Sequence, residues 1–188
     1  MVNWDRQTSA SLEGICAGHL NRYHFAAKKA KDFILDAACG CGYGSSLLHK
    51  VGDVTGIDLE PEAIKFASEH YPGPQYLVSD VTTHDGSYDW VVSFETLEHL
   101  PDPVSALKNF RKISGNLIIS TPNQKHYAFK PENYKESVYP HLRHYTPQEL
   151  DDILIGTGWT VIERHCQVKK SSPVLPGTEG MFIIYLCR

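Results

Sequence analysis

Residues 34–44 read Ile-Leu-Asp-Ala-Ala-Cys-Gly-Cys-Gly-Tyr-Gly, and Ser-Ser-Leu-Leu follows at 45–48. The apolar run stops at Asp36, and glycines stand at positions 40, 42 and 44 before the helix-like residues. A strand that turns into a helix through glycines lets backbone N–H groups approach a ligand that larger side chains would exclude. The stretch therefore predicts a strand, a turn and a helix that hold a nucleoside-like cofactor.

A second acid follows at the spacing of a nucleotide-binding α/β fold. Residues 53–58, Asp-Val-Thr-Gly-Ile-Asp, form an apolar strand that ends at Asp58, 22 positions after Asp36. In such folds an acid placed in this way binds ribose hydroxyls. The dinucleotide fingerprint is incomplete, because Ser45 stands where it requires a third glycine. Asp36 also favours a positively charged ligand over a pyrophosphate, since a carboxylate repels phosphate.

Short apolar strands alternate with helical patterns along the chain, which is typical of a mostly parallel sheet covered on both faces. We expect strands near 33–38, 53–58, 75–79, 88–94, 115–121, 159–167 and 180–187. Helices are expected near 8–30, 43–50, 61–70, 103–112 and 147–157, three of them starting at a proline. The last two strands have no helix between them, so they are expected to pair as an antiparallel hairpin through 171–180.

Length and composition indicate one ordinary domain over residues 1–188, with an N-terminal helical cap at 1–30. Hydrophobic residues make up 41% of the 188 positions, charged residues 21%, and the net charge is −4. No apolar run approaches the ~20 residues of a membrane span, and the first residues lack the apolar segment of a signal peptide. We therefore expect a cytoplasmic protein with no membrane partner.

Residues 122–145 have no clear periodicity and are long for a loop in a compact domain. Loops of this length are usually functional or disordered, and aromatic residues argue against disorder. Those aromatic residues are Tyr127, Phe129, Tyr134, Tyr139 and Tyr145. The segment is therefore predicted to form a packed lid that recognises the substrate, beside the carboxyl ends of the fourth and fifth strands.

Four motifs follow one another along the chain. They are Asp-Ala-Ala-Cys-Gly-Cys-Gly-Tyr-Gly at 36–44, Gly-Ile-Asp at 56–58, Ser-Asp-Val at 79–81 and Tyr-Asp-Trp-Val-Val-Ser-Phe-Glu-Thr-Leu-Glu-His-Leu-Pro-Asp-Pro at 88–103. In this order and spacing they resemble the motifs of class I S-adenosylmethionine-dependent methyltransferases. The resemblance covers about residues 19–187. It implies an α/β, Rossmann-like fold with a seven-stranded, mostly parallel sheet, an antiparallel C-terminal hairpin and helices on both faces.

The same resemblance implies S-adenosylmethionine as cofactor and suggests its contacts. The glycine turn meets the methionine part, the acid at 58 the ribose, and residues 80–81 the adenine amine. An arginine in a His-x-x-Arg-Tyr segment at 19–23, similar to one bacterial branch, pairs with the methionine carboxylate. The expected cofactor contacts are Arg22, Asp36, Ala38, Gly40, Gly42, Asp58, Leu59, Asp80, Val81 and Phe94. A loop cap at Asp80 and a solvated Arg22 are the structural alternatives.

Acidic and imidazole side chains gather directly after the fourth strand. If a helix starts there, Glu95, Glu98 and His99 share one face at the carboxyl edge of the sheet. Small-RNA 3′-end 2′-O-methyltransferases look similar here, and their histidine five residues before a threonine corresponds to His141. The four residues would form a site for Mn²⁺, Fe²⁺ or Zn²⁺. The bacterial branch also carries Glu-Thr-x-Glu-His-Leu-Pro and a Pro-x-His-x-x-x-x-Thr segment. By that resemblance the alternative to a metal ligand is a histidine that serves only as a base or a packing residue.

Methyl transfer requires a base only if the acceptor carries a proton to be lost, and Glu95, His99 and His141 are the catalytic candidates. Residues 122–145 hold four basic and two acidic residues, a surplus of two positive charges. A surplus this small is not a nucleic-acid footprint, and we expect no DNA partner. A hydroxyl or amine of a small molecule or sugar is the preferred acceptor. An RNA 3′ end and a non-catalytic, cofactor-binding module are the alternatives.

Overall fold

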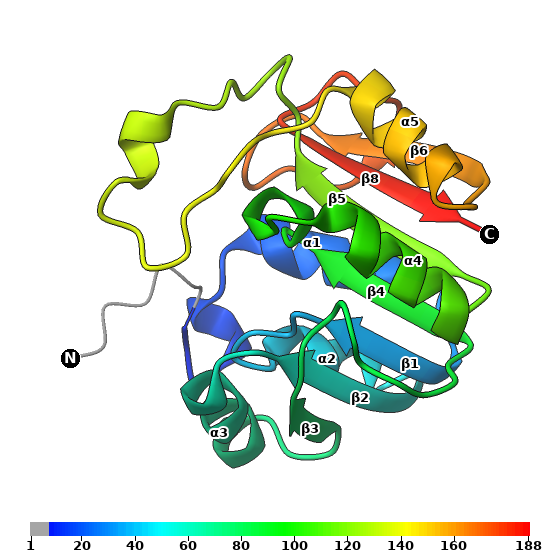
Figure 1. Cartoon of the computed structure of the whole chain (residues 1–188). Coiled ribbons are helices and arrows are strands. Elements are labelled where there is room, and N and C mark those ends of the chain that lie inside the picture. Colours follow the sequence, from blue (N-terminus) through cyan, green and yellow to red (C-terminus); the bar gives the residue numbers. More distant parts are fainter. Residues whose placement is uncertain (1–7) are drawn as a thin grey trace.

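The computed structural model describes residues 8–188 and arranges them around a mixed β-sheet (Figure 1). Over these residues the sheet has eight strands in the order β3-β2-β1-β4-β5-β8-β6-β7. They are β1 (Asp32–Ala37), β2 (Gly52–Asp58), β3 (Gln75–Val78), β4 (Trp90–Phe94), β5 (Leu117–Pro122), β6 (Val161–Gln167), β7 (Leu175–Pro176) and β8 (Phe182–Cys187). The first five strands pair in parallel, and β8 is antiparallel to both β5 and β6. The predicted Rossmann-like sheet and its antiparallel C-terminal hairpin are therefore confirmed.

Helices cover both faces of this sheet, as expected (Figure 1). They are α1 (Ala17–Ala26), α2 (Tyr43–Leu48), α3 (Pro61–His70), α4 (Pro103–Ile113) and α5 (Pro147–Gly156). Successive strand residues point to opposite faces. Accordingly, Ile34 of β1 packs in the cluster that contains residues of α1 and α2, whereas Leu35 packs in the cluster that contains residues of α4 and α5. The site-bearing strands are thus buried on both sides.

Local capping chemistry explains why the later helices begin where the sequence predicted. α4 begins with Pro103, and the Asp102 side chain accepts a hydrogen bond from the backbone N–H of Ser105. α5 begins with Pro147 behind a capping box, in which Thr146 and Glu149 each bond the other's backbone. Proline fits the first helical turn because its missing N–H has no partner there anyway. These starts fix the ends of the loops that lead into the helices.

The structure corrects three local predictions. The expected helix at 8–30 is α1, which spans only Ala17–Ala26 and follows a 3-10 turn at Leu12–Gly14; residues 1–7 of the expected cap lie outside the described residues. β7 lies inside the stretch predicted as a simple connection and adds a two-residue edge to β6. The helix considered at Glu95 is a 3-10 turn, Leu97–His99, because Glu95 has a left-handed φ of 52°.

The carboxyl ends of β1, β2, β4 and β5 meet along one edge of the sheet, because these strands run in parallel (Figure 1). Residues 122–145, called the lid below, leave the sheet at the end of β5 and lie beyond this edge (Figure 1). A backbone bridge between Asn123 and Tyr145 closes the base of the lid. None of the helices described for residues 8–188 is long and apolar enough to cross a membrane.

Candidate functional site

The glycine turn connects β1 to α2 and lies against the end of β2. Gly42 precedes α2 with a φ of 85°, and a Cβ added to it would lie 2.5 Å from the Cβ of Ala67. Only glycine meets both conditions without strain. The backbone N–H of Gly40 donates to Oδ2 of Asp58 over 2.9 Å, and Oδ1 of Asp58 accepts from Glu60 N–H. The two strand-terminal segments singled out in the sequence are therefore joined directly.

Ala38 also takes part in this turn, with a φ of 63°. Left-handed backbone is unusual for a residue with a Cβ and is maintained only where the surroundings enforce it. The backbone N–H of Cys39 donates to Ile57 O of β2 over 2.8 Å, which holds the segment from the other side. The turn is thus a rigid part of the sheet edge.

Asp36 is completely buried at the end of β1, and both of its carboxylate oxygens accept hydrogen bonds. The Tyr23 hydroxyl donates to Oδ1 over 3.1 Å, and the Ser45 hydroxyl donates to Oδ2 over 2.6 Å. Burial raises the pKa of Asp36 to about 7, although the two hydrogen bonds oppose the shift. The Tyr23 ring packs edge-on against Phe94 at 5.0 Å. Residues of α1 and α2 therefore meet at the Asp36 carboxylate of β1, and the end of β4 packs beside them through Tyr23.

Of the residues expected to meet adenine, Leu59 is exposed, whereas Asp80 and Val81 make contacts within the protein. Leu59 is 59% exposed after β2, as a side chain against a flat ligand must be. Oδ1 of Asp80 accepts bonds from both the N–H and the hydroxyl of Thr82, each over 2.7 Å, which is loop-cap geometry. The Val81 side chain is buried in the core, and its carbonyl accepts from Asn109. Asp80 thus organises its own loop.

Arg22 is buried in α1 with most of its hydrogen-bonding capacity unused. Its Nη1 donates to Oε1 of Gln167 over 2.6 Å, and its guanidinium lies 4.9 Å from the centre of the Phe182 ring. Nε and Nη2 are buried and have no hydrogen-bond partner among the described residues. Buried N–H groups without partners are costly, and these two lie on the edge of the guanidinium that binds carboxylates bidentately. The alternative of a solvated Arg22 is therefore excluded, because its side chain is buried.

Glu95 follows β4 directly, and Glu98 lies within the 3-10 turn Leu97–His99. The Ser120 hydroxyl donates to Oε1 of Glu95 over 2.7 Å, and the Thr121 hydroxyl donates to Oε2 of Glu98 over 3.2 Å. Oε1 of Glu98 is buried without a hydrogen-bond partner in the described part of the chain. Burial raises the pKa of both carboxyls, and the charge of Glu95 raises that of Glu98 further. Nearby Arg22 opposes both shifts.

Three of the four predicted metal-ligand residues come together. Glu98, His99 and His141 each have one ligand atom within 4.8 Å of the others, whereas Glu95 lies outside this group. The imidazole rings of His99 and His141 are 4.6 Å apart and nearly perpendicular. Burial lowers the pKa of His141 to about 3, with His99, His144 and Lys170 contributing. His141 therefore carries an unprotonated ring nitrogen at neutral pH.

The lid brings several aromatic side chains beside this group. The ring of Tyr134 stacks on His141 at 4.2 Å, and His144 contacts the rings of Tyr127 and Phe129. On the other side, the Tyr139 hydroxyl donates to the carboxylate of Glu60. Glu60 stands two residues after Asp58, so the lid contacts both the imidazole group and the segment expected to bind ribose.

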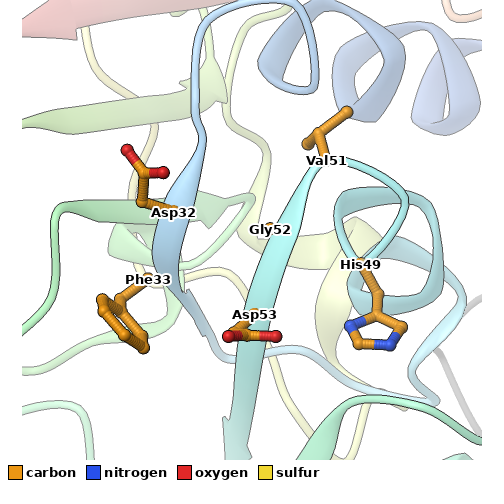
Figure 2. Close-up of a pocket in the computed structure, with 6 residues that line it drawn as sticks. All are labelled: Asp32, Phe33, His49, Val51, Gly52 and Asp53. Atoms are coloured by element: carbon orange, nitrogen blue, oxygen red, sulfur yellow. The ribbon is translucent and has the colours of Figure 1, made fainter.

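A separate hollow of about 420 Å³ lies at the opposite end of the sheet, by the amino ends of β1 and β2 (Figure 2). It is lined by Asp32, Phe33, His49, Val51, Gly52 and Asp53. None of the site residues predicted from the sequence lines it. The candidate site is therefore the carboxyl edge, where these residues converge.

Residues 35–116 match the family described as "Methyltransferase domain". The structure is similar to a possible histamine N-methyltransferase of Thermotoga maritima, with a TM-score of 0.76, 22% identity, and coverage of 91% of this chain and 88% of that one. Residues 35–116 therefore form a methyltransferase domain, and the fold is that of the class I S-adenosylmethionine-dependent methyltransferases. A second solved methyltransferase, from Mesorhizobium loti, has a TM-score of 0.75 and 16% identity, with 95% of this chain and all of that one covered. At these identities the solved structures establish the fold.

Sequence similarity to curated methyltransferases agrees with the family match. A probable S-adenosylmethionine-dependent methyltransferase of Mycobacterium tuberculosis is 30% identical over 133 residues, which are 67% of this chain and 48% of the relative. A ubiquinone biosynthesis O-methyltransferase of Psychrobacter arcticus is 32% identical over 152 residues, 68% of this chain and 58% of the relative. The chain thus spans about half the length of these relatives. The family indicates S-adenosylmethionine as the cofactor.

Sequence reasoning missed several residues of the site. Tyr23, Ser45 and Gln167 hold Asp36 and Arg22, and Glu60 contacts the lid. Tyr23 lies 13 residues before Asp36, and no helix or strand periodicity in the sequence relates the two positions. These contacts depend on how α1 packs on the sheet, which no local pattern contains.

Proposed function

We propose that this methyltransferase domain transfers a methyl group to a hydroxyl or amine of a small-molecule or sugar acceptor. The observation that carries the proposal is that the predicted cofactor segment around Asp36 lies beside the acids and histidines that follow β4. Tyr23 donates to Asp36 in the cofactor segment and packs on Phe94, and Glu95 follows directly in the second group. A methyl donor held by the first group would therefore lie beside potential bases in the second.

We assign the cofactor contacts as the sequence predicted. The turn with Asp36, Ala38, Gly40 and Gly42 would hold the methionine part, and the unpaired guanidinium edge of Arg22 would hold its carboxylate. The remaining contacts are Asp58 to ribose, Leu59 to adenine, Asp80 with the Val81 backbone to the adenine amine, and Phe94 near the sulfonium. The burial of Asp36 favours a cationic group beside it, because a positive charge stabilises the ionised carboxylate.

When bound, the cofactor supplies a methyl group that its sulfonium already activates. The chain's residues have to align the acceptor atom with the methyl and sulfur and receive the proton that the acceptor loses. With the cofactor bound, an electron pair of the acceptor would form the new bond to the methyl carbon, and the pair of the broken carbon–sulfur bond would stay on sulfur. We assign the proton to His141, which is unprotonated at neutral pH because burial lowers its pKa, or to His99, with Glu95 as the remaining candidate.

The relative named as a ubiquinone biosynthesis O-methyltransferase supports an oxygen acceptor. The test combines cofactor calorimetry with transfer of labelled methyl to panels of phenols, sugars and amines. We expect binding of S-adenosylmethionine and transfer to one class, with His141→Gln reducing turnover while cofactor affinity stays within about twofold. His126→Gln is the matched control, because His126 pairs with Glu179 outside the acid and imidazole group. Cofactor binding without transfer to any class would favour the non-catalytic module.

A metal-dependent RNA 3′-terminal 2′-O-methyltransferase is the second candidate, favoured by the unpaired Oε1 of Glu98 beside His99 and His141. One carboxylate and two imidazoles suit Mn²⁺, Fe²⁺ or Zn²⁺, and Glu95 would have to move to complete the predicted set. Such an ion would lower the pKa of an attacking hydroxyl. Metal analysis of the protein and of His141→Ala, together with methyl transfer to short RNAs with free or blocked 3′ ends, tests this candidate. Equal metal contents and no preference for free ends would exclude it.

A further inference from the structure

Hydrogen bonds inside the lid connect His141 to a backbone carbonyl through His144. Nδ1 of His144 lies 2.6 Å from the carbonyl oxygen of Tyr127, and Nε2 of His144 lies 2.8 Å from Nδ1 of His141. A carbonyl oxygen only accepts hydrogen bonds, so His144 must carry its proton on Nδ1. In neutral His144 the other nitrogen, Nε2, is then an acceptor. The proton in the contact between the two histidines therefore belongs to Nδ1 of His141.

Tyr134 offers a competing donor to the same nitrogen of His144. Its hydroxyl lies 3.3 Å from Nε2, compared with 2.8 Å for His141. The shorter contact is near the preferred length of such a bond, whereas the longer one is at its limit. His141 is therefore the main donor to His144.

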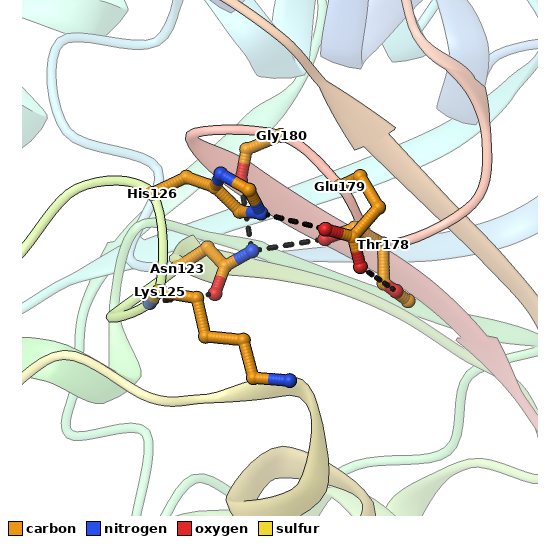
Figure 3. Close-up of polar contacts among 6 residues, drawn as sticks. All are labelled: Asn123, Lys125, His126, Thr178, Glu179 and Gly180. Carbon is orange, nitrogen blue, oxygen red and sulfur yellow. Dashed lines mark hydrogen bonds and ion pairs between the residues drawn. The ribbon is translucent and has the colours of Figure 1, made fainter.

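The chain of hydrogen bonds is anchored on the segment that leads into β8 and not only within the lid. The backbone N–H of Tyr127 donates to Asn123 O over 2.7 Å. Asn123 is completely buried, and its amide donates to Thr178 O over 2.9 Å and Gly180 O over 2.8 Å (Figure 3). His144, which is only 5% exposed, is consequently held by a fixed carbonyl. Its ring has one orientation and one protonation pattern.

The consequence for His141 is a choice between its two nitrogens. Because Nδ1 donates to His144, Nε2 is the nitrogen of His141 that retains a lone pair. One ring nitrogen of His141 lies within 4.8 Å of ligand atoms of Glu98 and His99. His99 has the same arrangement, since its Nδ1 lies 3.2 Å from Pro140 O and a carbonyl only accepts. In neutral His141, Nε2 is therefore the unprotonated nitrogen.

We propose that His144 is a positioning residue, which holds His141 in the Nδ1–H tautomer so that its Nε2 is free to take the acceptor's proton. The catalytic part of this inference rests on the proposed function, whereas the tautomer does not. Without His144, the imidazole of His141 is free to adopt the Nε2–H form that histidine prefers in water. In that form, Nε2 already bears a proton and cannot accept another.

Two substitutions separate hydrogen bonding from packing. His144→Phe keeps a flat ring among Tyr127, Phe129 and Tyr134 but has no acceptor for His141. His144→Gln supplies an amide whose N–H₂ can donate to Tyr127 O while its oxygen accepts from His141. Tyr134→Phe removes the weaker competing donor and is the control for the tautomer. Nitrogen NMR of ¹⁵N-labelled histidine reports which ring nitrogen of His141 is protonated.

We expect the Nδ1–H form of His141 in the wild type, in His144→Gln and in Tyr134→Phe, and the Nε2–H form in His144→Phe. We also expect turnover to fall at least about tenfold in His144→Phe, with cofactor KM little changed, and to return to within about threefold in His144→Gln. An unchanged tautomer in His144→Phe, or equal losses of turnover in both variants, overturns the proposal. Absence of methyl transfer by the wild type would refute the proposed function, and the spectra would still decide the tautomer.

Discussion

Replacing Asp36 by asparagine tests whether burial raises the pKa of this carboxyl group at the centre of the proposed cofactor site. Asp36 is fully buried, and burial raises its pKa from the ordinary 3.8 to about 7. Between these two values the folded chain holds a proton that the unfolded chain has released. Stability contributed by this proton is therefore complete below about pH 4 and is lost as the pH rises through 7.

The expected magnitude follows from the two pKa values. Proton linkage with 3.8 unfolded and about 7 folded lowers the free energy of unfolding by ~2–3 kcal/mol between pH 5 and pH 8. Asparagine cannot ionise, so Asp36→Asn should lack this component. The absolute stability of the variant is not needed, because only the change with pH is compared.

Urea unfolding at several pH values between 5 and 8 measures the difference. As the pH rises from 5 to 8, the free energy of unfolding of the wild type should fall by ~2–3 kcal/mol more than that of Asp36→Asn. Asp53→Asn, which alters an exposed carboxylate on the neighbouring β2, should keep the wild-type dependence. Parallel pH profiles for wild type and Asp36→Asn would refute the reasoning. In the wild type alone, affinity for the cationic cofactor should rise with pH over the same range, because the ligand favours ionised Asp36.

Three further substitutions test other contacts. Tyr139→Phe removes the bond from the lid to Glu60, worth about 1 kcal/mol, and should speed cofactor release ~5-fold in stopped-flow measurements; an unchanged rate would show that the lid does not retain the cofactor. Gly44→Ala places a Cβ 2.0 Å from the Tyr23 ring and should destabilise the fold by about 1–3 kcal/mol in urea. Gly115→Ala, with no atom within 4 Å, should change little. Arg22→Met removes the buried N–H groups that lack partners and should leave stability intact while weakening cofactor binding ~10-fold by calorimetry; equal affinity would contradict its assignment to the methionine carboxylate.

The sequence was sufficient for the architecture because its signals are local. Apolar runs that end at Asp36 and Asp58 mark strand ends, and parallel pairing brings those ends to one edge. The two-residue β7 has no such signal, since it is too short to show alternation. The turn after β4 was also not predicted, because no residue pattern indicates the left-handed backbone of Glu95.

Within the site, the sequence indicated residue types but not their partners. It singled out His141 and left His144 without a role, although the two rings are 2.8 Å apart between nitrogens. Their link depends on the carbonyl of Tyr127, 17 residues before His144, and thus on how the lid folds back. Likewise, only the packing of α1 on the sheet shows that Arg22 is buried with unpaired N–H groups.

The two ends of the lid are fastened to each other as well as to the sheet. Gln124 N–H donates to Tyr145 O, Tyr145 N–H donates to Pro122 O, and Asn123 N–H donates to Met181 O. Because the chain leaves and rejoins the fold at adjacent points, an insertion or deletion between them adds little loop-closure entropy and does not alter the strand register. The lid can therefore be replaced by a segment of different length or sequence without disturbing the sheet. Acceptor choice in such a domain can diverge through this segment while the strands that carry the proposed cofactor residues stay the same.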